Sequence, residues 1–435
     1  MIKMFVGLSR YVFVFLMGIY IFMTFRIFVI KDESDRELKC VQQNILMFFI
    51  HLLAFAILFI TEFDINILVL YLVQAFYMFM YIVIFHMLYK NGNMLLLNNM
   101  CMLMTIGFIM ITRLSFNQGL RQFIFIVTGS LLTLVIPVIM QKVKTLRNIP
   151  WLYGVVGIIA LLVVLIAGEL THGANIAIEI GNFISIQPSE FIKIVYVFFI
   201  ASMFNRSTSF GNVVLTTILA AVHVIILVLS TDLGGALIYF VVYLVMLYVA
   251  TREIIYPVLG ITAGSGAAFV AYKLFAHVRT RVNAWLDPWT LIDNQGYQIT
   301  QSLFAIGMGS WFGVGLNRGM PYKIPYVEMD FMFSAICEEF GIIFGICVIL
   351  LCMNTFMLMM DVGMKSKGQF YKLLAVGLAT AYGFQIFLTI GGGIKFIPLT
   401  GVTLPLISYG GSSAFSTLIM FAVIQGLFML RMNER

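Results

Sequence analysis

Charged residues are scarce in this sequence. Only 10% of its 435 residues are Asp, Glu, Lys or Arg, and 62% are hydrophobic, whereas about a quarter of a soluble domain is charged. This shortage excludes a soluble globular protein, and the net charge of +7 forms no block that would bind nucleic acid. Apolar runs of roughly 20 residues recur along the chain, and in lipid only helices or closed barrels satisfy such a backbone. The runs are too long and too uniformly apolar for barrel strands, so the sequence predicts an all-α, polytopic membrane protein.

Cysteine and histidine are also rare, with five of each. The cysteines lie in or beside apolar runs without paired spacing, so no disulfide framework is predicted. The histidines lack the spacing of a structural zinc site. There is no G-x-S-x-G elbow and no lysine P-loop, which leaves acyl-serine and ATP chemistry without support. The repeated G-x-G pattern at residues 307–315 follows no strand, so it does not indicate dinucleotide binding either.

The apolar runs predict about thirteen membrane-spanning helices, with twelve as the alternative count. The expected spans lie near residues 8–28, 43–62, 65–88, 98–113, 122–140, 151–168, 188–204, 212–230, 232–250, 255–275, 331–356, 371–391 and 411–430. Cytoplasmic loops carry an excess of Lys and Arg. Loops such as 142–147 and 365–372 are therefore expected in the cytoplasm, and the long connection 276–330 on the exterior side. Connections of that length are usually functional.

Three segments place ionisable side chains in or at the start of apolar runs, where each charge costs about 2.5–3.5 kcal/mol to insert. In SIQPSEFIKIV, Glu190 lies in the first turn of a predicted helix and Lys193 shares its face, so the pair either starts the helix or lines a site. In STDLGGALIYF, Asp232 either caps a helix beside packing glycines or faces a site. In PYVEMDFMFSAICEEFG, Glu338 is about 12 Å deeper than Asp330 on nearly the same helical face, so both can line one water-filled crevice.

These segments belong to a larger set of motifs that resembles the SEDS family (shape, elongation, division and sporulation), the group containing FtsW, RodA and SpoVE. The resemblance extends from roughly residue 98 to the C-terminus. The motifs are RLSFNQGLRQ (113–122), GANIAIEIGNFISIQPSEFIK (173–193), TDLGG (231–235), RVNAWLDPW with GYQITQSLFAIGMGSWFGVGL (281–316), PYVEMDFMFSAICEEFG (325–341) and FIPLTGVTLPLISYGGSS (396–413).

Family membership implies a ten-helix core, here residues 93–435 with the exterior loop 276–330, preceded by an extension of about three further helices in residues 1–92. It implies a peptidoglycan glycosyltransferase that polymerises lipid II at the outer face of the cytoplasmic membrane in division, elongation or sporulation. It also implies a partner, a class B penicillin-binding protein that crosslinks the product. A lipid II flippase or transporter and a non-catalytic scaffold for that protein are the alternative functions.

The resemblance also assigns site residues. The family's essential aspartate falls on Asp330, the QPSE-x-x-K carboxylate and ammonium fall on Glu190 and Lys193, and the arginine before W-x-x-P falls on Arg281. The chain departs from the family pattern in two places, where Ile176 and Ala177 replace a common Arg-Trp and where Glu328 and Met329 replace His-Thr.

The implied reaction joins a sugar hydroxyl to the anomeric carbon of another lipid-linked disaccharide and expels a lipid diphosphate. It needs a general base and cations for the leaving phosphates. We assign the base to Asp330 and the phosphate contacts to Arg281, Arg279, Lys193 and Lys395, with Glu190 and Glu338 as further site residues. A divalent cation, Mg²⁺ or Mn²⁺, bridging carboxylate and diphosphate remains an open alternative.

Overall fold

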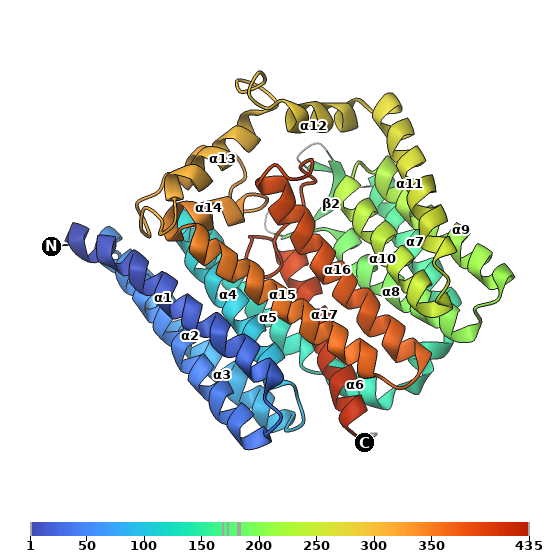
Figure 1. Ribbon diagram of the computed structural model, residues 1–435, viewed down its shortest axis with the longest axis horizontal. Coiled ribbons are helices and arrows are strands. Elements are labelled where there is room, and N and C mark those ends of the chain that lie inside the picture. Colours follow the sequence, from blue (N-terminus) through green and yellow to red (C-terminus); the bar gives the residue numbers. More distant parts are fainter. Residues whose placement is uncertain (1, 168, 172–173, 181–183, 434–435) are drawn as a thin grey trace. The chain divides into compact units, whose positions relative to one another are not determined.

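The computed structural model describes residues 2–167, 169–171, 174–180 and 184–433, most of them in long helices (Figure 1). The α-helices are α1 (Ile2–Val29), α2 (Glu33–Glu62), α3 (Ile65–Leu88), α4 (Met94–Leu114), α5 (Phe116–Thr133), α6 (Ile136–Lys142), α7 (Pro150–Ala167), α8 (Pro188–Arg206), α9 (Phe210–Leu229), α10 (Leu233–Thr251), α11 (Ile255–Leu274), α12 (Ala276–Leu286), α13 (Tyr297–Gly309), α14 (Met332–Phe340), α15 (Ile342–Lys365), α16 (Gln369–Gly393) and α17 (Gly411–Asn433). Two short 3₁₀ helices are η1 (Lys144–Asn148) and η2 (Pro321–Lys323).

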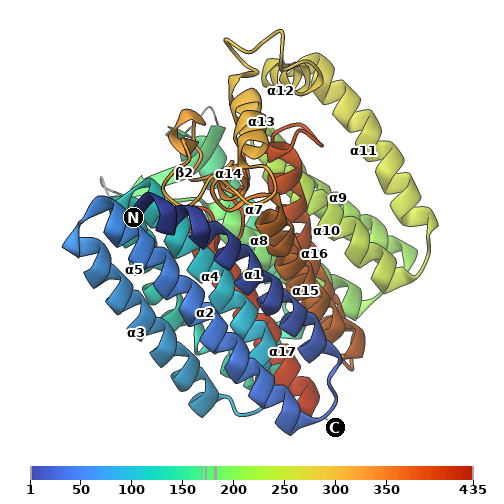
Figure 2. The same cartoon turned by 60° about the vertical axis from the view of Figure 1, so that its left-hand side comes forward.

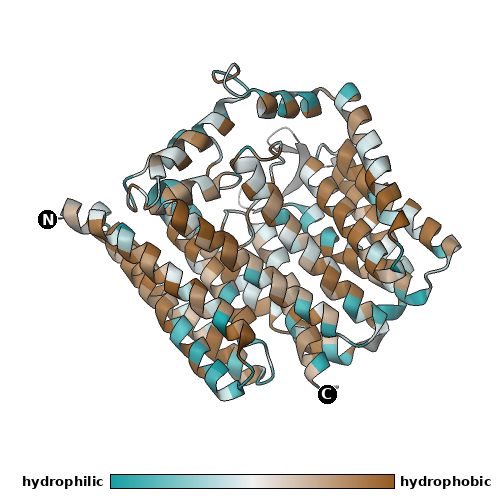
Figure 3. Ribbon diagram, viewed as in Figure 1, coloured by the Kyte–Doolittle hydropathy of each residue, from teal (hydrophilic) through white to brown (hydrophobic). Residues whose placement is uncertain are grey.

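The described helices confirm the all-α, polytopic membrane fold. Eleven of the helical segments in the described ranges are long and apolar enough to cross a membrane. Two further predicted spans correspond to α7, which is slightly shorter, and α8, which carries Glu190 and Lys193. Figure 3 shows hydrophobic colour along most of these helices and hydrophilic colour mainly at their ends and connections. The charge-poor runs of the sequence therefore form helices, as lipid requires.

Three short strands in the connection between α7 and α8 were not predicted. They are β1 (Glu169–Thr171), β2 (Ala174–Ile180) and β3 (Ile184–Ile186), and they pair antiparallel in that order. The segment ANIAIEI of β2 alternates apolar and polar residues over part of its length, which favours a strand. The long predicted connection 276–330 is likewise not irregular throughout, because it contains α12, α13 and η2.

The chain divides into two compact units. The first comprises residues 1–129, 281–358 and 386–410, and the second comprises residues 130–280, 359–385 and 411–435. In the first unit, α1, α2 and α3 lie side by side (Figures 1 and 2). In the second, α8 packs against α7, α10 and α17, and α17 also packs against α6.

Polar contacts fix the first two helices to α4 in the first unit. Gln43 of α2 donates from Nε2 to Thr24 Oγ1 of α1 at 2.7 Å, and Asn98 of α4 donates from Nδ2 to Gln43 Oε1 at 3.0 Å. The Tyr20 hydroxyl of α1 donates to the Asn98 carbonyl at 3.1 Å. All four side chains are buried. Hydrogen bonds of this kind hold helices together in lipid, where burial of apolar surface gives no drive for association.

The predicted span 331–356 is wrong in one respect, because the helix breaks at Gly341 into α14 and α15. The loop of residues 310–320, which we call the 310–320 loop, satisfies the backbone groups freed by the break. Val314 and Gly315 donate to the carbonyls of Glu338 and Glu339, both at 2.9 Å, and Ile342 donates to the Ser310 carbonyl at 2.9 Å. An interrupted helix is tolerated at membrane depth only where protein groups complete its hydrogen bonds in this way.

Glycine is required where this loop meets the break. Gly313 has φ +78°, and a Cβ there would overlap the carbonyl oxygen of Glu339; a Cβ at Gly309 would overlap the carbonyl oxygen of Cys337. The G-x-G pattern of the sequence therefore serves the close approach of two backbone segments.

We predict that Gly313→Ala lowers the stability of the purified protein by about 3 kcal/mol, because it combines left-handed backbone strain with a steric clash. Thermal unfolding in detergent measures the effect. Gly266→Ala on α11 is the matched control, since a Cβ at that position has no neighbour within 4 Å. Equal melting temperatures for the two variants would contradict the proposed packing.

Candidate functional site

Asp330 lies in a turn directly before α14. Its backbone N–H donates to the Tyr326 carbonyl at 3.1 Å, and Tyr326 has a positive φ of 56°, so the turn is tightly constrained. The Asp330 side chain is half-buried. A Cβ added to Gly401 would lie 3.9 Å from Asp330 Oδ2, so the carboxylate faces the FIPLTGVTLPLISYGGSS segment. The half-buried Asp330 carboxylate therefore lies between its own turn and residues 396–410.

Three hydrogen bonds hold residues 396–410 in place. Arg281 of α12 donates from Nη1 to the Thr400 carbonyl at 3.2 Å. Tyr409 donates its backbone N–H to the Glu328 carbonyl at 2.7 Å, two residues before Asp330. Gln122 of α5 accepts from the Gly410 N–H through Oε1 at 3.2 Å. Motifs far apart in the sequence thus converge on residues 396–410, the segment that the Asp330 carboxylate faces.

The electrostatics of Asp330 reflect these neighbours. The pKa of Asp330 is raised to about 6: burial raises it most, the Arg281 guanidinium lowers it, and the Glu328 carboxylate raises it. Asp330 lies outside the candidate membrane spans. A carboxylate with a pKa near the working pH is a better proton acceptor than an ordinary aspartate with a pKa of about 3.9. The structure thus brings the predicted residues Asp330 and Arg281 together.

Two other predicted phosphate ligands are placed differently. The Lys395 carbonyl accepts from Trp285 Nε1 of α12 at 3.2 Å, and Lys395 has a positive φ of 61°. The pKa of Asp287 is lowered mainly by a hydrogen bond from Thr290, and the Lys395 ammonium lowers it further. Arg279 is exposed on α12, two residues before Arg281. Within the described ranges, its side chain makes no hydrogen bond and no ion pair. The phosphate roles of Lys395 and Arg279 stay predictions.

Glu338 has partners of its own, apart from Asp330. Its Oε1 accepts from the Met320 N–H at 2.7 Å, and its side chain is only 2% exposed. It also lines a pocket of about 530 Å³ between α13 and η2, together with Gln301 and Lys323. The crevice that Asp330 and Glu338 were predicted to share stays a prediction, because the contacts of Glu338 are with the 310–320 loop.

The neighbouring acid, Glu339, was not predicted as a site residue. It is fully buried, and its Oε1 accepts from Arg113 Nε of α4 at 3.0 Å. Its Oε2 accepts from the Asn317 N–H at 3.2 Å, and Arg113 Nη2 also donates to the Gly319 carbonyl at 3.3 Å. Arg113 is the first residue of the RLSFNQGLRQ motif and lies at the end of an apolar run. A cation in that position was the sequence signal that could have indicated a buried acidic partner.

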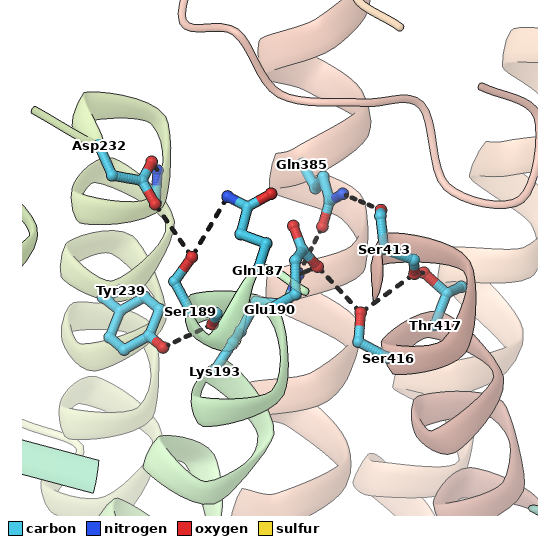
Figure 4. Close-up of polar contacts among 11 residues, drawn as sticks. Gln187, Ser189, Glu190, Lys193, Asp232, Tyr239, Gln385, Ser413, Ser416 and Thr417 are labelled. Carbon is cyan, nitrogen blue, oxygen red and sulfur yellow. Dashed lines mark hydrogen bonds and ion pairs between the residues drawn. The ribbon is translucent and has the colours of Figure 1, made fainter. Parts of the chain in front are cut away.

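The second unit contains a separate polar cluster at the start of α8 (Figure 4). Lys193 Nζ donates to Glu190 Oε2 at 2.8 Å and to Gln385 Oε1 of α16 at 2.7 Å. Ser416 of α17 donates to the same Glu190 oxygen at 2.9 Å. The cluster therefore joins three helices, and both charged groups are buried. The two predicted residues are brought together as an ion pair whose members already have partners.

Asp232 belongs to the rim of this cluster. Its Oδ1 accepts from the Gly235 N–H at 2.8 Å, which confirms the expected helix cap at the start of α10. Its Oδ2 accepts from the Ser189 hydroxyl at 3.1 Å, and Tyr239 donates to the Ser189 carbonyl at 2.9 Å (Figure 4). The arrangement ties the start of α8 to the start of α10. Ile176 and Ala177 lie on β2, and their side chains fall outside the described part of the structure.

These features define a polytopic helical membrane protein whose charged groups gather at helix starts and at an interrupted helix. The chain belongs to the FTSW_RODA_SPOVE family, described as "Cell cycle protein", whose model matches residues 93–432. This confirms the resemblance to the SEDS family.

Relatives agree with this assignment. The peptidoglycan glycosyltransferase RodA of Mycobacterium tuberculosis (strain ATCC 25618 / H37Rv) is 35% identical over 300 residues, which cover 65% of this chain and 64% of that protein. RodA of Mycobacterium leprae is 32% identical over 356 residues, 76% of each chain. A chain solved in a peptidoglycan synthase complex has a TM-score of 0.67 at 22% identity, covering 78% of this chain and 98% of its own. That likeness supports the fold alone.

The buried ion pair of α8 predicts a stability effect. Lys193→Met leaves the Glu190 carboxylate buried without its cation, so we expect a loss of about 3–5 kcal/mol. Lys365→Met is the control, because Lys365 pairs with Asp361 at 2.6 Å on the surface, with side chains 56% and 29% exposed; such pairs contribute about 0–1 kcal/mol. Thermal unfolding in detergent distinguishes the two.

A double variant tests whether the charges of Glu190 and Lys193 are coupled. Lys193→Met combined with Glu190→Gln removes both charges, and part of the lost stability should return. If the double variant is no more stable than Lys193→Met, the two charges are not coupled in the way the geometry indicates.

Proposed function

We propose that this chain is a peptidoglycan glycosyltransferase that polymerises lipid II into glycan strands at the outer face of the cytoplasmic membrane. The observation that carries the proposal is the half-buried Asp330 carboxylate, facing Gly401 and lying within reach of the Arg281 charge. Both residues belong to the family-matched segment. The names of the mycobacterial relatives support the reaction class.

In the proposed reaction, Asp330 removes the proton from a sugar hydroxyl. The hydroxyl oxygen then bonds to the anomeric carbon of a second lipid-linked disaccharide, and the bond from that carbon to the diphosphate breaks. The proton ends on Asp330, and the electron pair leaves with the lipid diphosphate. Arg281 stabilises the developing negative charge, since a guanidinium donates two parallel hydrogen bonds to phosphate oxygens.

A divalent cation fits this site only if the substrate supplies some of its oxygen ligands. Within the described ranges, no group of three or more His, Cys, Asp and Glu side chains is arranged to hold a metal ion. Asp330 would therefore supply one oxygen ligand, and the diphosphate would supply the others. Bound there, Mg²⁺ or Mn²⁺ would neutralise charge on the leaving group.

The proposal extends to a partner. A glycosyltransferase that makes uncrosslinked glycan needs a transpeptidase, and we assign that role to a class B penicillin-binding protein. The chain of similar fold belongs to a complex described as coordinating polymerization and crosslinking, and we propose an assembly of the same kind here.

The base assignment predicts a loss of activity on removal of one charge. Asp330→Asn keeps the shape of the side chain but cannot accept the proton, so polymerisation of lipid II should fall about 100- to 10,000-fold. Gel analysis of labelled lipid II with purified protein measures the rate. Asp293→Asn, at an exposed aspartate of the same exterior region, should retain activity.

Two outcomes would contradict the proposal. Native polymerisation by Asp330→Asn would remove the base assignment. Transfer of labelled lipid II across liposome membranes by the wild-type protein, with no polymer formed alone or with candidate transpeptidases, would favour a flippase.

The pKa of Asp330 predicts the pH dependence. The base must be ionised, so kcat/KM should fall about tenfold per pH unit below a midpoint near pH 6. Removing the cation in Arg281→Gln raises the pKa of Asp330 and moves the midpoint upward. Removing the acid in Glu328→Gln lowers the pKa and moves the midpoint downward. Midpoints that do not move in opposite directions would show that another group titrates.

A further inference from the structure

Helix α1 lies before the family-matched residues 93–432, yet it contacts the 310–320 loop directly. Arg10 donates from Nη1 to the Gly313 carbonyl at 3.0 Å, and its guanidinium stacks over the Tyr11 ring at 4.8 Å. The Tyr11 ring in turn contacts Phe312, with centroids 5.1 Å apart. One helix turn of the extension thus holds the backbone and a side chain of the loop.

The same helix contacts the end of α14. Phe13 is fully buried, and its ring meets that of Phe340 edge to face with centroids 5.0 Å apart. Phe340 is the last residue of α14, next to the break at Gly341. Helix α1 therefore touches both segments that pair across the break.

The end of α2 holds the loop from a second point. Asn317 donates from Nδ2 to Thr61 Oγ1 at 2.8 Å and to Glu62 Oε1 at 3.3 Å. The backbone N–H of Asn317 donates to Glu339 Oε2 at 3.2 Å. One residue therefore connects the extension to the buried acid of α14, and its φ of 63° suits asparagine.

The extension is itself anchored. The buried contacts among Tyr20, Gln43 and Asn98 fix α1 and α2 to α4, and α4 carries Arg113, the cation that pairs with Glu339. The loop is thus held on one side by α4 and on the other by α1 and α2. Glu338 and Glu339 each accept one side-chain hydrogen bond from a backbone N–H of this loop, and Asp330 stands at the other end of the same short helix.

We propose that α1 and α2 form a clamp on the 310–320 loop that fixes α14 and thereby positions Asp330. Arg10 and Asn317 are the positioning residues of this clamp, because they act on Asp330 through the loop and α14. The catalytic part of the inference rests on the proposed function. The clamp itself does not, because it can be measured without any turnover.

The first measurement is hydrogen–deuterium exchange in the full-length protein. The amides of Val314, Gly315, Asn317 and Met320 donate to groups of Glu338 and Glu339, so their exchange reports whether the loop is docked. In Arg10→Gln we expect these amides to exchange at least about tenfold faster, because local opening becomes easier. Arg26→Gln, at an exposed arginine near the other end of α1, should leave the exchange unchanged.

The second measurement is polymerisation kinetics. A positioning role predicts that Arg10→Gln lowers kcat about tenfold with little change in KM, and that Arg10→Lys, which keeps a donor for the Gly313 carbonyl, restores most of it. Phe13→Ala and Phe15→Ala form a second matched pair, since Phe13 is buried against Phe340 whereas Phe15 is 67% exposed. Only Phe13→Ala should lower kcat.

The results separate the possibilities. If Arg10→Gln does not give folded protein, Asn317→Gly replaces it, because glycine keeps the positive φ and loses only the contacts with α2. Faster loop exchange with an unchanged kcat would overturn the positioning role, and exchange equal to that of Arg26→Gln would overturn the clamp. If the wild-type protein makes no polymer, the proposed function fails while the exchange result still decides the clamp.

Discussion

The interruption between α14 and α15 is the constraint on which the Asp330 region of this structure depends. A helix that stops in an apolar region leaves carbonyl and N–H groups that lipid cannot satisfy. The 310–320 loop supplies those partners, and it can approach only because Gly309 and Gly313 have no side chain. The interruption makes α14 a short helix of 9 residues, with Asp330 just before it and two buried acids at its end. The backbone that carries Asp330 is thereby held by a short helix and its bonded loop.

The two charged clusters of the chain differ in what they can do. Glu190 and Lys193 are buried, they bond to each other, and Gln385 and Ser416 complete their hydrogen bonds. Such a pair holds helices in register, and a substrate phosphate would have to displace Glu190 to reach the ammonium. Asp330 is half-buried; burial raises its pKa most, the Arg281 guanidinium lowers it, and the Glu328 carboxylate raises it. The proposed reaction is therefore assigned to Asp330 and Arg281, and the substrate contacts of Glu190 and Lys193 stay predictions.

Features that depend on residues close together in the sequence, such as helices and their caps, could be predicted. Apolar runs predicted the helices, and Asp232 was expected to cap one. The sequence failed where distant segments meet. The G-x-G pattern gave no sign that it packs against the end of α14, because its partner carbonyls lie more than twenty residues further along the chain. Arg113 and Glu339 are even further apart, and no local spacing relates them. The assignment of Asp330 and Arg281 came from the family resemblance, and the structure adds the shared environment that the motifs alone do not describe.

The central claim is that the Asp330 carboxylate accepts a proton from the attacking sugar hydroxyl. A structure of the protein with an unreactive lipid-linked disaccharide bound would test it most directly. The account predicts an Asp330 oxygen about 2.6–3.2 Å from a sugar hydroxyl, the reach of a general base, with Arg281 against the diphosphate of the second substrate. A sugar bound elsewhere, with Asp330 facing lipid or closed off by protein, would contradict it.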